Sequence, residues 1–410
     1  MLSAVWQRVK IRAHGLKWQE RDEKDVPKEM LRRLDVYTAI GLGFVQIGLV
    51  RGEDFHARGL YLALRAGERR RLARYFLWES MFLANGGDDR NSLFLYENGA
   101  RIAAVLDDPF LKGLAEGTRG FLALSHDHHR EAFDAFEESL RIWRERGTGT
   151  WEQHIAVPMF LQIGIDILGR VREERARFES LTREAEQRGD RLMQTILRTS
   201  CGLVWLARGD ADGLEAALDS IPWRLAAIME AGVSRYESWW EVFETITRAQ
   251  IALFRGDRRG LEAVYPALHE AAGSLLGRLP MVRSRSRSLV GRVALALGQR
   301  DTARKAADEL QGFGTRYAML LAEALRAGCE AQEGNASASA ARLLPAQRLS
   351  DSLGTRLLSL ALLRRRGELL GQSEGRALVA EADERLRAEQ FVDPERICRI
   401  VAPGFRPLSP

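Results

Sequence analysis

Apolar residues recur at helical spacing along most of the chain. Between residues 127 and 146, Phe133, Phe136, Leu140 and Trp143 are separated by three, four and three positions, and charged residues occupy the opposite face. This spacing is typical of an amphipathic helix lying on a core. The same spacing recurs at Phe178, Leu181 and Ala185, and at Ala303, Ala306, Ala307 and Leu310. Sustained alternation of apolar and polar residues, the mark of a strand, is absent. The pattern predicts an all-α fold.

Turn signals divide these helices at a nearly regular interval. They lie at residues 86–88, 126–127, 169–170, 209–210, 256–257, 298–299 and 334–335, and their first residues are 36 to 47 positions apart. Most contain a glycine, which can adopt the positive φ that ends a helix, followed by a polar residue that can start the next one. Helix pairs that recur at about 40 residues indicate an α-solenoid, in which each pair buries its apolar face against its neighbours.

The units resemble tetratricopeptide repeats. In one unit Gly120, Ala132 and Phe136 match the small and aromatic positions of that repeat, and Gly291 and Ala303 do so in another. Small residues are needed where two helices cross closely. We therefore expect a right-handed α-α superhelix of about eight degenerate helix pairs over residues 1–402. It comprises N-terminal helices (1–60), repeats (61–366) and C-terminal capping helices (367–402, with one near 394–401), followed by an extended tail (403–410).

The first helix, expected over residues 2–18, has apolar residues that need a neighbour. Leu2, Val5, Trp6 and Val9 lie at helical spacing there. A preceding domain or a second copy of the chain would supply that neighbour.

Composition narrows the class of protein. The 410 residues include 61 basic and 56 acidic side chains, so the net charge is only +5 and nucleic acid is an unlikely partner. Three scattered cysteines, Cys201, Cys329 and Cys398, indicate reduced thiols and a cytoplasmic protein. The N-terminus lacks a signal peptide, and the longest uncharged stretch, residues 36–50, is too short to cross a bilayer, which favours a buried helix there and no membrane partner.

Four strings resemble one specific source: IGLGFVQIGLVRGEDFHARGLYLALRAGE (40–68), RAQIALFRGD (248–257), GELLGQSEGRALVAEADERL (367–386) and DPERICRIVAPGF (393–405). They are similar to the C-terminal tetratricopeptide-like region of large bacterial serine/threonine protein kinases, which also carry an AAA-type ATPase domain. The resemblance covers residues 20–405. It implies a signal-transduction module that regulates an attached or associated kinase–ATPase.

The chain lacks the catalytic motifs of that family. It has no phosphate-covering glycine loop, no HRD-type or DFG-type aspartate and no Gly-Lys dipeptide for a P-loop. We therefore expect a non-catalytic protein–protein interaction scaffold, without a cofactor, whose partner is a protein or peptide such as a kinase or ATPase domain. The alternative is a small-effector-sensing domain of a signalling or transcription-regulating ATPase. An enzyme would need a convergent catalytic group, and none is indicated. The oligomeric state is left open.

Four groups of residues are candidate functional sites. Gly41, Gly43 and Gly48 have neither the spacing nor the preceding strand of a nucleotide fingerprint, so they indicate close helix packing. His126, Asp127, His128 and His129 lack a second pair of metal ligands, which favours a solvated turn over a metal site.

The other two groups are candidates for partner binding. Arg283, Arg285 and Arg287 alternate with serines and suit phosphate contact or serine phosphorylation, although a solvated helix face is the more ordinary interpretation. Similar basic runs lie at residues 65–74 and 364–366. Trp239 and Trp240 are about 100° apart on a helix, so one of them can be an exposed anchor in a groove, although packing in the core is the more ordinary interpretation.

Overall fold

A computed structural model of the chain describes residues 2–221, 236 and 238–405, and this part is almost entirely helical. It contains twenty-one α-helices, and its only extended pairing is an isolated bridge between Arg21 and Glu68. The all-α prediction is confirmed.

The helices group into two compact units. The first comprises Met1–Ser125, Asp134–Val157 and Leu225–Trp239, and the second His126–Phe133, Pro158–Arg224 and Trp240–Pro410. The helices wholly within the first unit are α1 (Leu2–His14), α2 (Lys28–Ile47), α3 (Leu49–Ala66), α4 (Arg69–Asn85), α5 (Asp89–Leu106) and α6 (Pro109–Ser125). Two helices, α7 (His129–Arg146) and α8 (Thr150–Gln162), contribute several residues to both units, and the first residue of α14, Trp239, belongs to the first unit while the rest of that helix belongs to the second.

The second unit begins its regular structure with a π-helix, η2 (Ile163–Ile167). The helices that follow are α9 (Val171–Gln187), α10 (Arg191–Ser200), α11 (Gly202–Ala207), α12 (Ala211–Asp219), α14 (Trp239–Arg255), α15 (Arg258–Gly273), α16 (Pro280–Ala296), α17 (Arg300–Gly312), α18 (Arg316–Gln332), α19 (Ala336–Ser352), α20 (Arg356–Leu370), α21 (Gln372–Ala388) and α22 (Pro394–Val401). The short 3₁₀-helices η1 (Glu23–Asp25) and η4 (Leu276–Arg278) lie in the first and second unit, respectively.

All seven predicted turns separate two helical elements, as the spacing required. Gly87, Gly209 and Gly298 are typical of them, with φ between 79° and 81°. At the second turn Asp127 adopts φ 61° without being a glycine. The side chains of Asp88 and Asp210 accept hydrogen bonds from the first turns of α5 and α12. The turn chemistry visible in the sequence therefore sets the helix boundaries.

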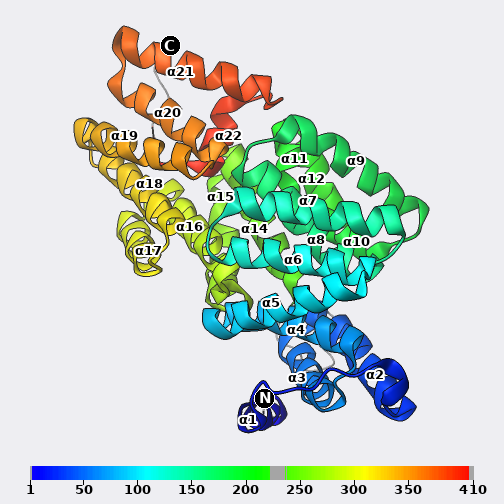
Figure 1. The fold of residues 1–410 in the computed structure, drawn as a ribbon. Coiled ribbons are helices and arrows are strands. Elements are labelled where there is room, and N and C mark those ends of the chain that lie inside the picture. The colour runs from blue at the N-terminus through cyan, green and yellow to red at the C-terminus, as the bar shows by residue number, and fades with distance from the viewer. Residues whose placement is uncertain (1, 222–235, 237, 406–410) are drawn as a thin grey trace. The chain divides into compact units, whose positions relative to one another are not determined.

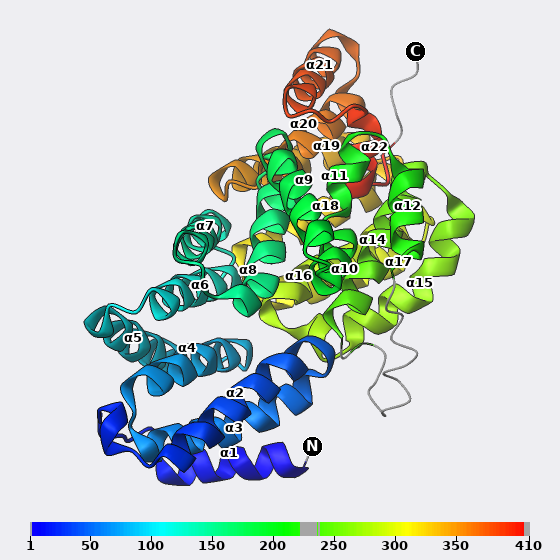
Figure 2. The ribbon, with the colours of Figure 1, turned by 90° about the vertical axis from the view of Figure 1, so that its right-hand side faces the viewer.

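Successive helices pack on one another in the C-terminal half of the second unit. Each helix from α16 to α21 contacts the next, and this run can be followed from yellow to orange in Figures 1 and 2. The predicted apolar face of α17, Ala303, Ala306, Ala307 and Leu310, is buried. A Cβ atom on Gly291 of α16 would lie 2.5 Å from Leu325 of α18 and 3.1 Å from the Cβ of Ala306. Gly291 therefore lies at a close helix crossing, which is the packing role expected for it, and Ala303 is buried on the apolar face of α17.

The repeat residues of α6 and α7 are also buried. Gly120, Ala132 and Phe136 are enclosed, as are Phe133, Leu140 and Trp143 on the same face of α7. The indole of Trp143 donates to the carbonyl of Phe110 at 3.1 Å. The amphipathic pattern of residues 127–146 is therefore confirmed as a single helix with a buried face.

The uncharged stretch at residues 36–50 does not form the single buried helix that the sequence predicts. α2 ends at Ile47 and α3 begins at Leu49, with Gly48 between them. Val36 on α2 is exposed. Separately, no helix in the described ranges combines the length and apolarity needed to span a bilayer.

The C-terminal end of the second unit is anchored by a buried ion pair. The predicted helix near residues 394–401 is present as α22. The Arg365 side chain is 1% exposed, donates to the carboxylate of Glu368 at 2.8 Å and donates from Nε to the carbonyl of Ala402 at 2.9 Å. Residues 406–410 of the expected tail lie outside the described residues. Cys201, Cys329 and Cys398 are all buried free thiols of this unit.

Candidate functional site

Helix α1 has apolar side chains on two faces. Ala4, Gln7 and Ile11 are buried, and α1 packs on α3. The side chains of Val5, Trp6 and Val9 lie outside this buried face and are 61%, 57% and 50% exposed, respectively. The neighbour that the sequence pattern of α1 demands is therefore only partly supplied within the described structure.

The exposed face of α1 forms one wall of a groove in the first unit. The groove has a volume of about 830 Å³. Its α1 wall contains Val5, Arg8, Val9, Ile11, Arg12, Gly15 and Leu16, and its other wall, from α4 and α5, contains Glu79, Leu83, Asp88, Arg90, Asn91 and Phe94. We call this the α1–α5 groove. Apolar side chains on both walls make it suited to bind another molecule.

A buried ionic network fixes α1 beside the groove. Arg8 donates to Glu53 at 3.0 Å and to Glu79, and the Nε2 of His56 lies 3.0 Å from the other oxygen of Glu79. Burial favours the protonated form of Glu79, but the hydrogen bond to His56 and the charge of Arg8 outweigh it and lower the pKa of that carboxyl. Burial likewise opposes the charge on Arg8, but Glu79 and Glu53 raise the pKa of its guanidinium. Both groups are therefore charged at neutral pH.

The lining of the groove carries a net positive charge. Arg12 and Arg90 are exposed, and among the described residues neither has an ion-pair partner. The carboxylate of Glu79 is engaged by Arg8 and His56. The Asp88 side chain accepts from the backbone and side-chain amides of Asn91, capping α5, and these neutral donors leave its negative charge in place. Three arginines therefore face two acids in the lining, which gives a net charge of +1.

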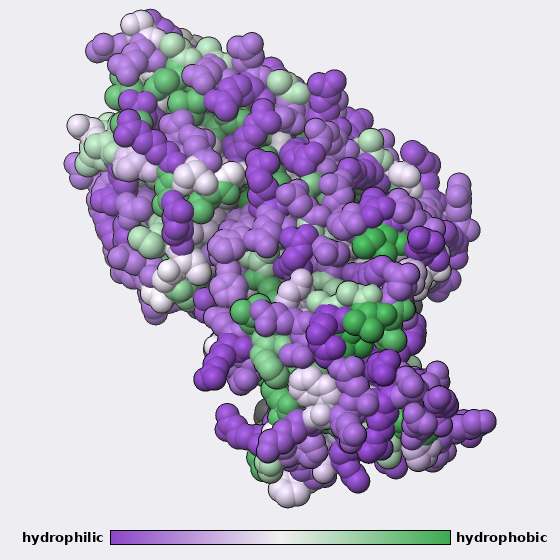
Figure 3. Space-filling model, in the orientation of Figure 1, coloured by the Kyte–Doolittle hydropathy of each residue, from purple (hydrophilic) through white to green (hydrophobic). Residues whose placement is uncertain are grey.

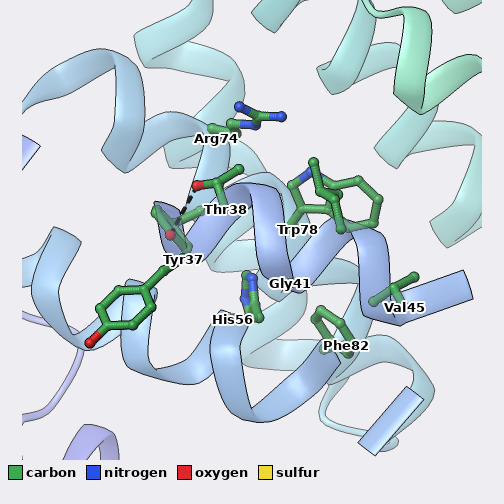
Figure 4. A pocket seen from close by; sticks show the side chains of 10 residues that line it. Tyr37, Thr38, Gly41, Val45, His56, Arg74, Trp78 and Phe82 are labelled. Carbon is green, nitrogen blue, oxygen red and sulfur yellow. Dashed lines mark hydrogen bonds between the residues drawn. The ribbon is translucent and has the colours of Figure 1, made fainter. Parts of the chain in front are cut away.

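A small cavity lies behind the network, between α2, α3 and α4 (Figure 4). Its volume, about 20 Å³, is enough for about one water molecule. Tyr75 donates to the carbonyl of Leu34 at 3.0 Å, and Thr38 donates to the hydroxyl of Tyr75 at 2.9 Å, shown dashed in Figure 4. The cavity is too small for an organic ligand.

Of the two glycines within α2, only Gly41 serves helix packing. A Cβ atom on Gly41 would lie 3.5 Å from the backbone of Gly52 and His56 in α3, and one on Gly52 would lie 2.7 Å from the backbone nitrogen of Val45. A Cβ atom on Gly43 would meet nothing within 4 Å, so the expectation of close packing is wrong for Gly43.

The second unit contains a cluster of enclosed polar side chains. Arg285 on α16 donates to Asp166 of η2 at 2.6 Å and to Gln162 of α8 at 2.8 Å. Burial raises the pKa of Asp166 to about 6, although Arg285 opposes that shift. We call this set, together with His129 and Tyr317, the Asp166 cluster.

His129 is the residue that sequence reasoning placed wrongly. It begins α7, and its imidazole is almost fully buried against Tyr317, with ring centroids 4.5 Å apart. Burial lowers the pKa of His129 to about 3. The expectation of a solvated turn is right for His128, which is exposed, but wrong for His129. No set of three metal-ligating side chains occurs in the described ranges, so His126, Asp127, His128 and His129 do not form one.

The arginines of the RSRSRS string point to different sides of α16. Arg283 lies over the ring of Phe313, Arg287 forms an ion pair with Glu309 at 2.8 Å, and Arg285 reaches Asp166. Two residues along a helix turn the side chain by about 200°, which explains this division. The intervening Ser284, Ser286 and Ser288 are buried. A solvated face is therefore the wrong description, and the buried serines do not present a phosphorylation site.

The two adjacent tryptophans are unequally placed. Trp240 is 6% exposed and Phe243 is equally buried, whereas Trp239 is half-buried. Trp240 is therefore a packing residue. Of the pair, only Trp239 retains enough exposed surface for partner contact.

The basic runs are neutralised by neighbouring acids. In the first unit Arg70 pairs with Asp108, Arg71 with Asp35 and Arg74 with Glu152. In the second unit Arg364 pairs with Asp383, Arg365 with Glu368 and Arg366 with Glu374. These runs therefore offer no continuous strip of free charge to a nucleic acid.

No family model matches the chain, and no curated protein matches it significantly. The geometry alone therefore identifies the candidate site. Most of the face in Figure 3 is hydrophilic, with hydrophobic side chains in separate small patches. Against such a surface, the α1–α5 groove stands out because apolar side chains line a hollow of about 830 Å³. Its lining combines apolar side chains with arginines, which suits contact with another molecule.

Proposed function

We propose that this protein is a non-catalytic protein–protein interaction scaffold that docks a partner in the α1–α5 groove. The observation that carries the proposal is the exposure of Val5, Val9 and Phe94 on facing walls of one groove. Large apolar side chains left in water at the walls of a hollow are typical of interaction sites.

The finer fold belongs to the same proposal. We propose that the helix pairs form a tetratricopeptide-like, right-handed superhelix of degenerate repeats. The interval of about 40 residues between turns and the close crossing at Gly291 support it. Such repeats serve mainly to present binding surfaces.

The biological setting rests on the sequence resemblance. It favours a cytoplasmic module of bacterial signal transduction whose partner is a serine/threonine kinase or an ATPase domain. The exposed apolar side chains of the α1–α5 groove support this role, but fold analogy does not name a partner.

Site-specific photo-crosslinking tests the scaffold. A benzoylphenylalanine at Phe94 should crosslink a discrete partner in cells, because that side chain lies in the groove and is partly exposed. The same group at Arg259, an exposed residue of the second unit, is the matched control. Adding Val9→Glu to the Phe94 variant should abolish the crosslink. A crosslink pattern identical at Phe94 and Arg259, or none at Phe94, would contradict the proposal.

A second candidate function is the sensing of a small effector by the second unit. It is favoured by two buried polar atoms that have no hydrogen-bond partner among the described residues. One is the Nδ1 of His129 in the Asp166 cluster, and the other is the Nε of Arg292 on α16, whose guanidinium interacts electrostatically with Asp166. Buried polar atoms without partners often mark a ligand site. Screening acidic metabolites for a thermal shift that disappears in Arg285→Met tests this candidate. No shift with any of them would argue against it.

A further inference from the structure

We infer that the occupant of the α1–α5 groove is an amphipathic α-helix of a partner protein, with aspartate and glutamate residues flanking its apolar stripe. This inference rests on the proposed function and adds the chemistry of the partner. It draws on the size of the groove, the spacing of its apolar side chains and the net positive charge of its lining.

The groove matches a helix in size. An α-helix with its side chains is about 10 Å wide, so a volume of about 830 Å³ corresponds to a cylinder about 11 Å long. That length is about two helical turns. A single extended strand would leave much of the width empty, and a whole folded domain would not enter.

The apolar side chains have the spacing that a helix requires. Val5 and Val9 lie one turn apart on α1, and Leu16 follows beyond the end of that helix. Leu83 and Phe94 face them from α4 and α5. A helix that places apolar residues at i, i+3 or i+4, and i+7 presents one stripe about two turns long to such walls.

The free charges favour an acidic partner. Arg12 on one wall and Arg90 on the other lack ion-pair partners in the described structure, and they lie beside the apolar side chains. Arg8 is paired with Glu53 and Glu79, whereas Asp88 accepts from neutral amides and keeps its charge, so the lining as a whole has a net charge of +1. A helix with acidic flanks would pair with Arg12 and Arg90, whereas a basic helix would meet them as like charges. Exposed pairs of this kind contribute more to specificity and association rate than to affinity.

Fluorescence anisotropy with two designed peptides tests the inference. Each has 18 residues and leucines at positions 4, 7, 8, 11 and 15, about the number needed for one apolar stripe. One carries glutamate at the flanking positions and the other lysine. The wild-type chain should bind the glutamate peptide at least about tenfold more tightly than the lysine peptide, which is about 1.4 kcal/mol. The difference should shrink as salt is raised.

Charge reversal in the groove makes the test specific. Arg12→Glu/Arg90→Glu should invert the preference between the two peptides, whereas Arg258→Glu/Arg259→Glu, in the second unit, should leave it unchanged. Val9→Glu should weaken binding of both peptides. Circular dichroism and the thermal midpoint check that each variant is folded, which is expected because the replaced side chains are exposed or half-exposed.

Each outcome decides the question. Equal binding of both peptides, or a preference that survives charge reversal, overturns the acidic helix. If neither peptide binds while Phe94 still crosslinks a partner, the inference fails and the scaffold stands. If neither peptide binds and no crosslink forms, both fail. A dimer in sedimentation that Val9→Glu dissociates would make the occupant a second copy of the chain, which also overturns the inference.

Discussion

Two regions, one in each unit, depart from an ordinary soluble surface in opposite directions. Around α1 the first unit leaves valine, tryptophan and phenylalanine side chains in water. Around α16 and α20 the second unit encloses arginine, aspartate, glutamate and histidine. Exposed apolar groups cost the monomer little, whereas buried charges must find their partners inside the fold. Substitutions should therefore affect binding in the first region and stability in the second.

The buried ion pair of α20 should show the largest effect. Glu368→Ala leaves Arg365, which is 1% exposed, without its carboxylate, so unfolding should become easier by about 3–5 kcal/mol. Glu79→Ala in the first unit should cost only about 1–3 kcal/mol, because Arg8 is partly exposed and can be hydrated. Urea unfolding followed by circular dichroism measures both.

Glu381→Ala is the control for this pair, since Glu381 forms only an exposed bridge with Arg385. Its cost should stay below about 0.5 kcal/mol. Equal losses from Glu368→Ala and Glu79→Ala would break the comparison between the units.

The pH dependence of stability should reveal the buried histidine. The pKa of His129 is about 3 in the folded chain, against an ordinary value near 6.5, so the unfolded state binds the proton more tightly. Stability from this group is fully present above pH 6.5 and is lost as pH falls toward 3. His129→Phe keeps an aromatic ring and removes the titration. Between pH 8 and pH 5 it should reduce the loss of stability by about 2 kcal/mol.

The titration of Asp166 should change the pH dependence of stability in the opposite sense to that of His129. Its pKa of about 6 is raised by burial, so its folded state binds the proton more tightly than the unfolded chain does. Its contribution is fully present below the unfolded pKa near 4 and is lost as pH rises through 6. Asp166→Asn should therefore make the stability loss from pH 8 to pH 5 larger by about 1 kcal/mol. Urea midpoints at the two pH values measure it, and identical pH profiles for both variants and the wild type would contradict both assignments.

Replacing two glycines with alanine should have opposite effects on stability, because one glycine is tightly packed and the other is not. Gly291→Ala places a Cβ atom 2.5 Å from the buried Leu325 and should destabilise the chain by about 1–2 kcal/mol. Gly43→Ala, in the middle of α2, meets nothing within 4 Å and should stabilise it by up to about 1 kcal/mol through helix propensity. Thermal midpoints should move in opposite directions, and a shift of the same sign for both would show that packing at α16 is not the deciding factor.

The smallest stability effect is expected in the groove itself. Val5→Ser/Val9→Ser removes apolar groups that are already largely in water, so the free energy of unfolding should change by less than about 0.5 kcal/mol. Partner binding should nevertheless be lost. A large loss of stability in this variant would mean that the α1 side chains belong to the core.

Much of the fold was predictable from local patterns. The turns at Gly87, Gly209 and Gly298 and the last helix, α22, follow from glycine spacing, capping aspartates and the proline at the start of α22, all of which act within a few residues. The buried faces of α7 and α17 follow from helical periodicity. These features depend on near neighbours in the sequence, and so the sequence alone reveals them.

The candidate sites were less predictable because they depend on distant residues. The pattern of Val5, Trp6 and Val9 showed that α1 needs a neighbour, but only the fold places Leu83 and Phe94 opposite them. The burial of His129 depends on Tyr317, which is nearly two hundred positions away in the sequence. The pairing of Arg285 depends on Asp166 of a π-helix that no residue pattern predicted. The break at Gly48 was missed because an uninterrupted apolar run resembles one helix.

The placement of the three thiols gives the chain built-in reporters. Cys201, Cys329 and Cys398 all lie buried in the second unit, and the first unit has no cysteine. A thiol reagent can therefore modify the native chain only when the second unit opens, so its labelling rate measures that opening alone. A cysteine introduced at Val9 would be the one surface thiol, and it would accept a probe while the folded second unit stays unlabelled. Motions of the two units can thus be followed separately, by the speed at which each thiol reacts.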